Sequence, residues 1–194
     1  MPPGILAATG MLLVAALTPG PNNLVVLRTA ARGDLAAVSS AIAGIVLGGV
    51  LMLVVVTVAA DAMPAGWTSL RWVVASAGAI YLGWLGVGMV RGAGQSGAGR
   101  LPAGFAGLLA FQFLNPKGWA MVLALVAAFP GQGVAGTLLW LGPLFLFVPF
   151  ACLLLWALAG RYLAYFLRMP ARQRVFDRIM GLALLASTGL LLLP

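Results

Sequence analysis

The chain has 194 residues, of which 63% are hydrophobic and only 7% are charged, with 11 Lys and Arg against 3 Asp and Glu and no histidine. This composition excludes an ordinary soluble domain, because such domains are about 45 to 50% apolar and about 25% charged. Without histidine, and with Cys152 as the single cysteine, transition-metal sites, thiol redox relays and an intramolecular disulfide lose their ligands or partners. We therefore expect an integral membrane protein without a cofactor.

Six stretches are apolar enough to cross a hydrocarbon core roughly 30 Å thick. They cover residues 4–27, 35–60, 72–90, 105–129, 136–159 and 179–193. The last is short, and would use Val175 and Phe176 as well or thin the bilayer locally. The first has neither the basic start nor the cleavage site of a signal peptide, so we expect it to be retained. The predicted fold class is an all-α polytopic membrane protein.

The basic residues lie almost entirely in alternate connections. Nine fall in the first, third and fifth connections, and one falls in the second and fourth together. The positive-inside rule then places the nine in the cytoplasm and both termini outside. The net charge of +8 is explained by this topology, so we do not expect nucleic-acid binding.

The first and fourth stretches are each interrupted by a polar, proline-centred motif, TPGPNN at 18–23 and LNPKG at 114–118. Asn115 is suited to cap a new half-helix and Pro116 to occupy its first turn. In the first motif, either Thr18-Pro19 or Gly20-Pro21 would begin a half-helix. A proline can merely kink a membrane helix, and we assign that role to Pro143 and Pro149.

The two interruptions occupy matching places in the two halves of the chain, since Pro21 and Pro116 are 95 positions apart. Each lies in the first span of a three-span half, and halves with three spans enter the membrane from opposite sides. This arrangement is typical of inverted repeats, in which discontinuous helices form a substrate site near the midplane. We expect one transmembrane transporter domain over 1–194, with repeat 1 at about 1–90, a cytoplasmic linker at about 91–104 and repeat 2 at about 105–194.

Three motifs carry a resemblance to a known family. PGPNNL at 19–24, AGAIYLGWLG at 77–86 and FLNPKGW at 113–119 resemble, in order and spacing, the LysE/RhtB family of amino-acid exporters. The resemblance implies a transporter of the bacterial cytoplasmic (inner) membrane that is linked to the proton-motive force. The family motifs fall on Pro19, Gly20, Pro21, Asn22 and Asn23, and on Asn115, Pro116 and Lys117.

Two positions depart from the family pattern. Many members have Asp where this chain has Asn22, and Asn where it has Gln112. Both positions stay polar, but an asparagine cannot exchange a proton.

The predicted function is export of amino acids or related zwitterionic metabolites by alternating access. The substrate carboxylate would meet the half-helix N-termini and Lys117, which lies about 18 Å into its segment at 1.5 Å per residue. Asn22, Asn23, Gln112 and Asn115 would contact other polar groups of the substrate. Asp34 is a candidate gate or coupling residue and otherwise an ordinary interfacial one. Tyr81 is a second candidate, with core packing as its alternative.

Other interpretations of the sequence remain open. The chain could be a non-transporting membrane scaffold or subunit that acts through its basic cytoplasmic connection. An enzyme is not expected, because no catalytic dyad is visible. The GxxxG pattern of Gly44 and Gly48 could support a homodimer or, as the default, packing within the chain.

Overall fold

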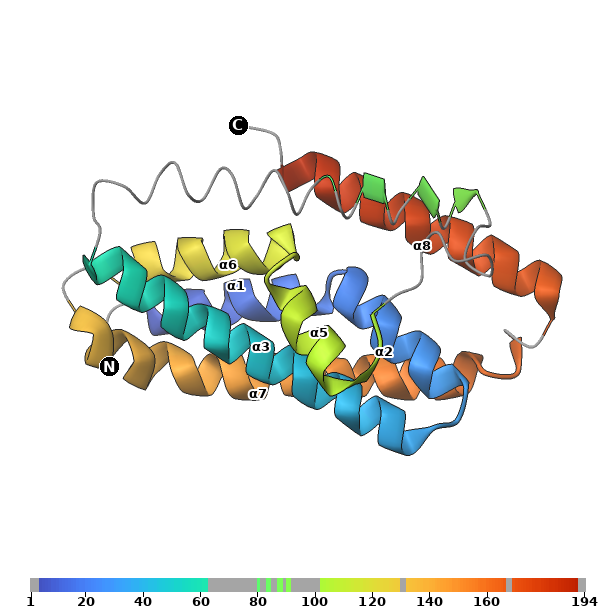
Figure 1. Ribbon diagram of the computed structural model, residues 1–194, viewed down its shortest axis with the longest axis horizontal. Coiled ribbons are helices and arrows are strands. Elements are labelled where there is room, and N and C mark those ends of the chain that lie inside the picture. Colours follow the sequence, from blue (N-terminus) through green and yellow to red (C-terminus); the bar gives the residue numbers. More distant parts are fainter. Residues whose placement is uncertain are drawn as a thin grey trace.

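The computed structural model describes residues 4–62, 80, 83–84, 87–88, 90–91, 102–129, 132–166 and 169–191. Every element of regular structure in these residues is a helix (Figure 1). The helices are α1 (Ile5–Leu17), α2 (Pro21–Ala31), α3 (Leu35–Ala62), α5 (Gly104–Gln112), α6 (Pro116–Ala127), α7 (Gly133–Leu163) and α8 (Pro170–Leu191). Most of the predicted third segment, 72–90, lies outside the described residues.

Two single helices, α3 and α7, are long and apolar enough to cross a membrane. Two further spans arise if each bent pair of helices counts as one. The axes of α1 and α2 differ by 51°, and those of α5 and α6 differ by 55°. The described residues therefore contain two to four spans, and the first and fourth predicted segments are each broken at their polar motif.

The prediction for the last segment was wrong at its start. We expected an apolar helix from residue 179, whereas α8 begins at Pro170. Its first turns carry Arg172, Arg174 and Arg178, so much of the basic stretch that we placed in a connection is helical. A proline suits the first turn of a helix, which accounts for the new boundary.

The helix α7 packs against α1, α2 and α3 along its length. Two groups of buried apolar residues lie on either side of the helix breaks. One joins α2 and α5 to the first half of α3 and the last half of α7. The other joins α1 and α6 to the last half of α3 and the first half of α7. The breaks in α1–α2 and α5–α6 therefore fall between two separate apolar cores.

Small residues bring the backbones close together at two of these contacts. A Cβ atom added to Gly44 would lie 2.5 Å from the carbonyl oxygen of Phe105, and one added to Gly48 would lie 2.8 Å from that of Leu109. The GxxxG face of α3 thus packs against α5 of the same chain. This confirms our default prediction that Gly44 and Gly48 serve packing within the chain. Gly160 of α7 lies equally close to the backbone of Leu27.

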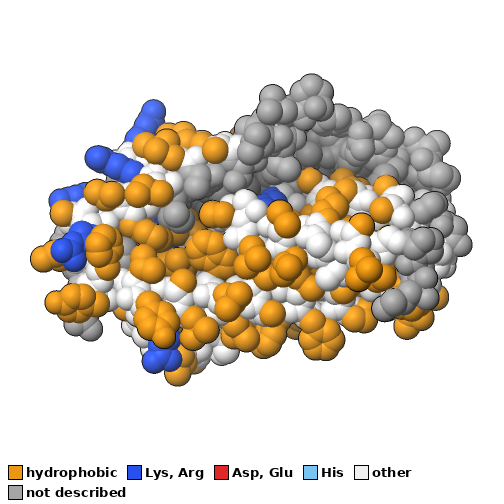
Figure 2. Space-filling view, turned by 180° about the vertical axis from the view of Figure 1, so that it is seen from behind, with side chains coloured by type: hydrophobic (Ala, Val, Ile, Leu, Met, Phe, Trp, Pro, Cys, Tyr) orange, Lys and Arg blue, Asp and Glu red, His pale blue; other side chains and the backbone are white. Residues whose placement is uncertain are grey.

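The charged and apolar surfaces are segregated. Figure 2 shows the Lys and Arg side chains gathered mainly at one end of the molecule, while hydrophobic side chains cover much of the rest of that face. Arg28 and Arg32, near the end of α2, and Arg161, near the end of α7, belong to the connections that we predicted to be basic. Large apolar side chains such as Leu6, Leu139 and Phe147 are more than 60% exposed, as expected for a surface in contact with lipid.

Candidate functional site

The first break is closed by side chains that satisfy the carbonyl groups freed at the end of α1. The two Nδ2 hydrogens of Asn23 are donated to the carbonyl oxygens of Ala16, at 3.0 Å, and Thr18, at 2.8 Å. The hydroxyl of Thr18 donates to the carbonyl of Val14 at 2.6 Å. These bonds are needed because a buried carbonyl without a partner is costly where water is scarce.

The helix α2 begins without a side-chain cap. Gly20 is its N-cap residue, in an extended conformation, and Pro21 occupies its first turn. We considered Thr18-Pro19 and Gly20-Pro21 as the start of this half-helix, and the structure has Gly20-Pro21. Because Gly20 has no side chain to cap with, the first free N–H groups of α2, those of Asn22 and Asn23, are left for another acceptor.

The second break follows the predicted local chemistry. Asn115 is the N-cap of α6, and its side-chain oxygen accepts a bond from the backbone N–H of Lys117 at 3.2 Å. Pro116 is the first residue of the helix. The carbonyl of Phe113, freed at the end of α5, accepts a bond from the indole N–H of Trp119 at 2.9 Å.

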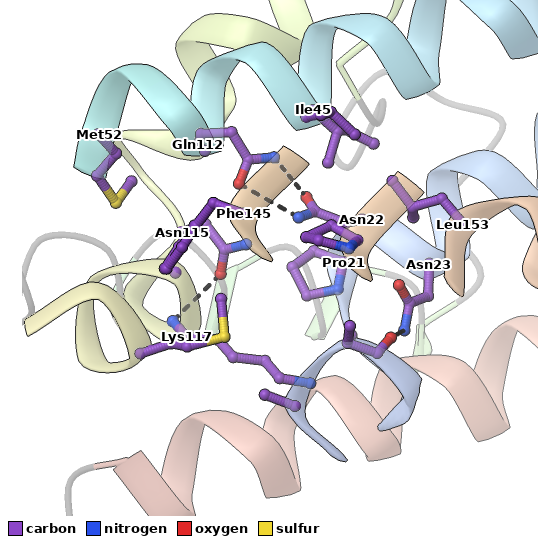
Figure 3. Close-up of a pocket in the computed structure, with 18 of the residues that line it drawn as sticks. Pro21, Asn22, Asn23, Ile45, Met52, Gln112, Asn115, Lys117, Phe145 and Leu153 are labelled. Atoms are coloured by element: carbon purple, nitrogen blue, oxygen red, sulfur yellow. Dashed lines mark hydrogen bonds between the residues drawn. The ribbon is translucent and has the colours of Figure 1, made fainter. Parts of the chain in front are cut away.

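The two breaks are joined to each other across the two halves of the chain. The side-chain amides of Asn22 and Gln112 form a reciprocal pair, with Asn22 donating at 3.2 Å and Gln112 donating at 3.0 Å. The Nζ atom of Lys117 donates to the carbonyl oxygen of Thr18 at 2.9 Å. Figure 3 shows the pair of Asn22 and Gln112, which are 90 positions apart in the sequence. Thr18 and Lys117 are 99 positions apart. The two helix breaks therefore contact each other directly.

A cavity of about 80 Å³ opens at this junction. Its polar wall comes from the two breaks, and its apolar wall comes from α3, α6 and α7, including Met52, Met121, Phe145 and Leu153. It contacts both apolar cores, since Leu153 belongs to one and Phe145 to the other. The volume admits a small solute or a few waters, because one water needs only about 10 to 15 Å³ measured in this way.

The described residues that line the cavity carry one formal positive charge and no negative one. Lys117, which is half-buried, is the only charged residue among those that line it. The chain has three acidic residues in all. Asp34 directly precedes α3, Asp61 is the last residue but one of that helix, and Asp177 lies in α8. Both the lysine and the uncapped start of α2 favour a negatively charged group in the cavity.

Seven of the nine residues predicted to bind substrate line the cavity, namely Gly20, Pro21, Asn22, Asn23, Gln112, Asn115 and Lys117. Pro19 is exposed and does not line it. Asn23 and Asn115 are 6% and 3% exposed and also hold the breaks in shape, a role that we predicted for Asn115 as a helix cap but not for Asn23.

Of the two candidate gate residues, Asp34 is described by the structure and does not line the cavity. Asp34 is exposed at the start of α3, where its Oδ1 accepts a bond from the backbone N–H of Ala37 at 2.9 Å. It precedes Ile45, the first residue of α3 that lines the cavity, by 11 residues, or about 16 Å along a helix. Tyr81 lies outside the described residues.

Sequence reasoning missed the contribution of α3 and α7. The cavity is also lined by Ile45, Gly49 and Met52 of α3 and by Phe145 and Pro149 of α7. None of these five residues is polar, so no polar side chain marked them in the sequence. Sequence reasoning also missed the carbonyl of Thr18 as the partner of Lys117. The one available signal was Pro149, which we took as a kink only.

Comparison with known proteins gives one clear match. A family model described as LysE type translocator matches residues 13–193 of the chain. No curated protein and no solved structure matches it. The matched residues include both helix breaks and the whole cavity lining.

Proposed function

The chain belongs to the LysE type translocator family of membrane transporters, and on that premise we propose that it exports amino acids or related zwitterionic metabolites by alternating access. The observation that carries this proposal is the bond between Lys117 and the carbonyl of Thr18. It places the one cation of the cavity where two discontinuous helices meet. Such a meeting point is where secondary transporters bind their substrates.

The cavity is suited to a carboxylate on one side and an apolar group on the other. The carboxylate would be bound by Lys117 and by the free N–H groups at the start of α2, since both attract anions. The amides of Asn22 and Gln112 would contact further polar groups. Met52, Met121 and Phe145 would pack against the rest of the solute.

The membrane topology is part of the proposal. Six segments would form two inverted three-helix repeats, with α1–α2 and α5–α6 as the discontinuous first helix of each. The end of the molecule that gathers Arg28, Arg32 and Arg161 would face the cytoplasm of a bacterium, with both termini outside the inner membrane. A gate or coupling role for Asp34 or Tyr81 stays a prediction.

Alternating access would use the contacts that join the two breaks. The bonds from Lys117 to Thr18 and from Gln112 to Asn22 link the repeats directly. Rocking of one repeat against the other would open the cavity to each side in turn. A bound carboxylate would compete with the Thr18 carbonyl for Lys117, so substrate binding and the inter-repeat contact would be coupled.

The test is export from intact cells. Cells that produce the protein, or its Asn115→Ala/Lys117→Ala variant at the same membrane level, are loaded with a panel of amino acids as dipeptides, and the medium is followed over time. We expect faster release of a subset of amino acids with the unaltered protein alone.

Equal release of every amino acid by the two proteins would contradict the proposal. The scaffold alternative makes the opposite prediction about residues. If it holds, substitution of the arginines of the basic connection disturbs function, namely Arg168, which lies outside the described residues, Arg172 and Arg174. Asn115 and Lys117 would then tolerate replacement.

A further inference from the structure

A zwitterion in this cavity needs a partner for its ammonium group, and none of the described residues that line the cavity has a negative side chain. Asp34 and Asp61 lie next to or at the ends of α3 and do not line the cavity, and Asp177 lies in α8. A buried ammonium without acceptors is strongly disfavoured. Neutral oxygen atoms of the cavity wall must therefore accept its hydrogen bonds.

The helix α7 provides such an atom at Pro149. This proline lies inside the continuous helix Gly133–Leu163, and because proline has no N–H, the carbonyl of Phe145 loses the bond it would accept in a regular helix. Both Phe145 and Pro149 line the cavity. Residues four apart lie on the same face of a helix, so the gap in the hydrogen-bond ladder is located in the cavity wall.

The second proline of α7 shows that this placement is particular to Pro149. Pro143 likewise frees the carbonyl of Leu139. Pro143 is exposed, Leu139 is 69% exposed, and neither lines the cavity. Of the two carbonyls that prolines free in this helix, only that of Phe145 belongs to a residue of the cavity.

Further acceptors lie on the opposite wall. In the reciprocal amide pair, Asn22 Oδ1 and Gln112 Oε1 each accept one hydrogen bond from the other amide, and an amide oxygen can accept two. In the view of Figure 3 this pair lies on one side of Asn115 and Lys117 on the other. The acceptors thus lie apart from the cation, as the two charged groups of an amino acid require.

We propose that the Phe145 carbonyl freed by Pro149, together with the amide oxygens of Asn22 and Gln112, is the ammonium subsite of this cavity. This inference rests on the proposed function and names its substrate class: amino acids with an uncharged, mainly apolar side chain. A basic side chain would add a second cation to a cavity that already holds Lys117 and whose described lining has no carboxylate to neutralise it.

The first experiment uses the full-length protein in proteoliposomes and needs no variant. Transport of labelled neutral amino acids is measured, with competition by the matching 2-hydroxy acid, in which a hydroxyl replaces the ammonium, and by lysine and arginine. We expect the amino acid to bind about tenfold more tightly than its 2-hydroxy analogue, and lysine and arginine to compete weakly.

The second experiment compares Pro149→Ala with the matched control Pro143→Ala. Alanine restores the N–H that occupies the Phe145 carbonyl. Pro149→Ala should therefore weaken binding of the amino acid about tenfold and leave that of the 2-hydroxy acid nearly unchanged, whereas Pro143→Ala should alter neither.

The outcomes separate this inference from the function on which it rests. If no amino acid is transported, the proposed function itself fails. If neutral amino acids are transported but the 2-hydroxy acid binds as tightly, or lysine is carried equally well, only the ammonium subsite is overturned. Equal weakening of both ligands by Pro149→Ala would assign the proline a packing role and would also overturn it.

Discussion

The Nζ atom of Lys117 lies 2.9 Å from the carbonyl oxygen of Thr18, 99 positions earlier in the chain. The Thr18 carbonyl has no partner within α1, because that helix ends at Leu17. Lys117 lies near it in the first turn of α6, which begins at Pro116. The same oxygen also accepts a bond from Asn23 at 2.8 Å. The Thr18 carbonyl oxygen therefore binds both Asn23, which shapes the first break, and Lys117, the cation of the second break.

Replacing Lys117 by methionine keeps an unbranched side chain, one atom shorter, and removes its charge. Loss of a charged contact with substrate is worth about 1.5 to 3 kcal/mol, so export at low substrate concentration should fall roughly tenfold to a hundredfold. Arg161→Met, at the exposed end of α7, removes a cation elsewhere and is the control. Full export by a well-folded Lys117→Met protein would remove the lysine from the mechanism.

The amide pair of Asn22 and Gln112 should show strong coupling in a double-mutant cycle. Gln112 is 3% exposed, so loss of its partner in Asn22→Ala leaves a buried amide incompletely bonded, at a cost of about 1 to 3 kcal/mol. The double alanine variant should cost less than the two single variants added together. The free energy of unfolding in detergent measures this, and strict additivity would mean that the pair contributes nothing.

Close packing of α3 on α5 should make Gly48 intolerant of a side chain. A Cβ atom there would lie 2.7 Å from Gln112 Cγ and 2.8 Å from the Leu109 carbonyl, so Gly48→Ala should destabilise the protein by about 1 to 3 kcal/mol. The neighbouring Gly49 has nothing within 4 Å of the same position. Gly49→Ala should keep or raise the melting temperature, and an equal loss for both variants would contradict this packing.

The buried hydroxyl of Thr57 predicts a stabilising substitution. It is 4% exposed and has no hydrogen-bond partner among the residues that the structure describes. Thr57→Val keeps the shape and removes the unsatisfied group, so stability should rise by about 1 kcal/mol. Thr29 donates to the Val25 carbonyl at 2.8 Å, and Thr29→Val should not be stabilising. A melting temperature lowered by Thr57→Val would show that the hydroxyl has a partner.

Local features of the two breaks could be predicted because they depend on residues a few positions apart. The Asn115 cap and the prolines that begin α2 and α6 follow from side-chain chemistry within a single turn. The start of α8 was predicted wrongly, because we let hydropathy alone set the boundary and overlooked the helix-starting tendency of Pro170.

Contacts between the two halves could not be predicted from the sequence. Nothing in it indicates that Asn22 faces Gln112, or that Lys117 donates to a backbone atom of Thr18, since these pairs depend on how whole helices pack. The contribution of α3 and α7 to the apolar wall of the cavity was not predicted for a related reason. In a segment hydrophobic all around, no periodicity marks the face that lines a cavity.

The most direct test of the central claim uses the fact that Lys117 is the only lysine of the chain. The purified protein in proteoliposomes is treated with a small amine-reactive reagent, and modification of Lys117 is followed by mass spectrometry with and without a saturating amino acid that the same preparation transports. Binding of the carboxylate at Lys117 predicts that this amino acid slows the modification severalfold, while a non-transported amino acid does not. An unchanged rate in the presence of a transported amino acid would contradict the placement of the substrate in this cavity.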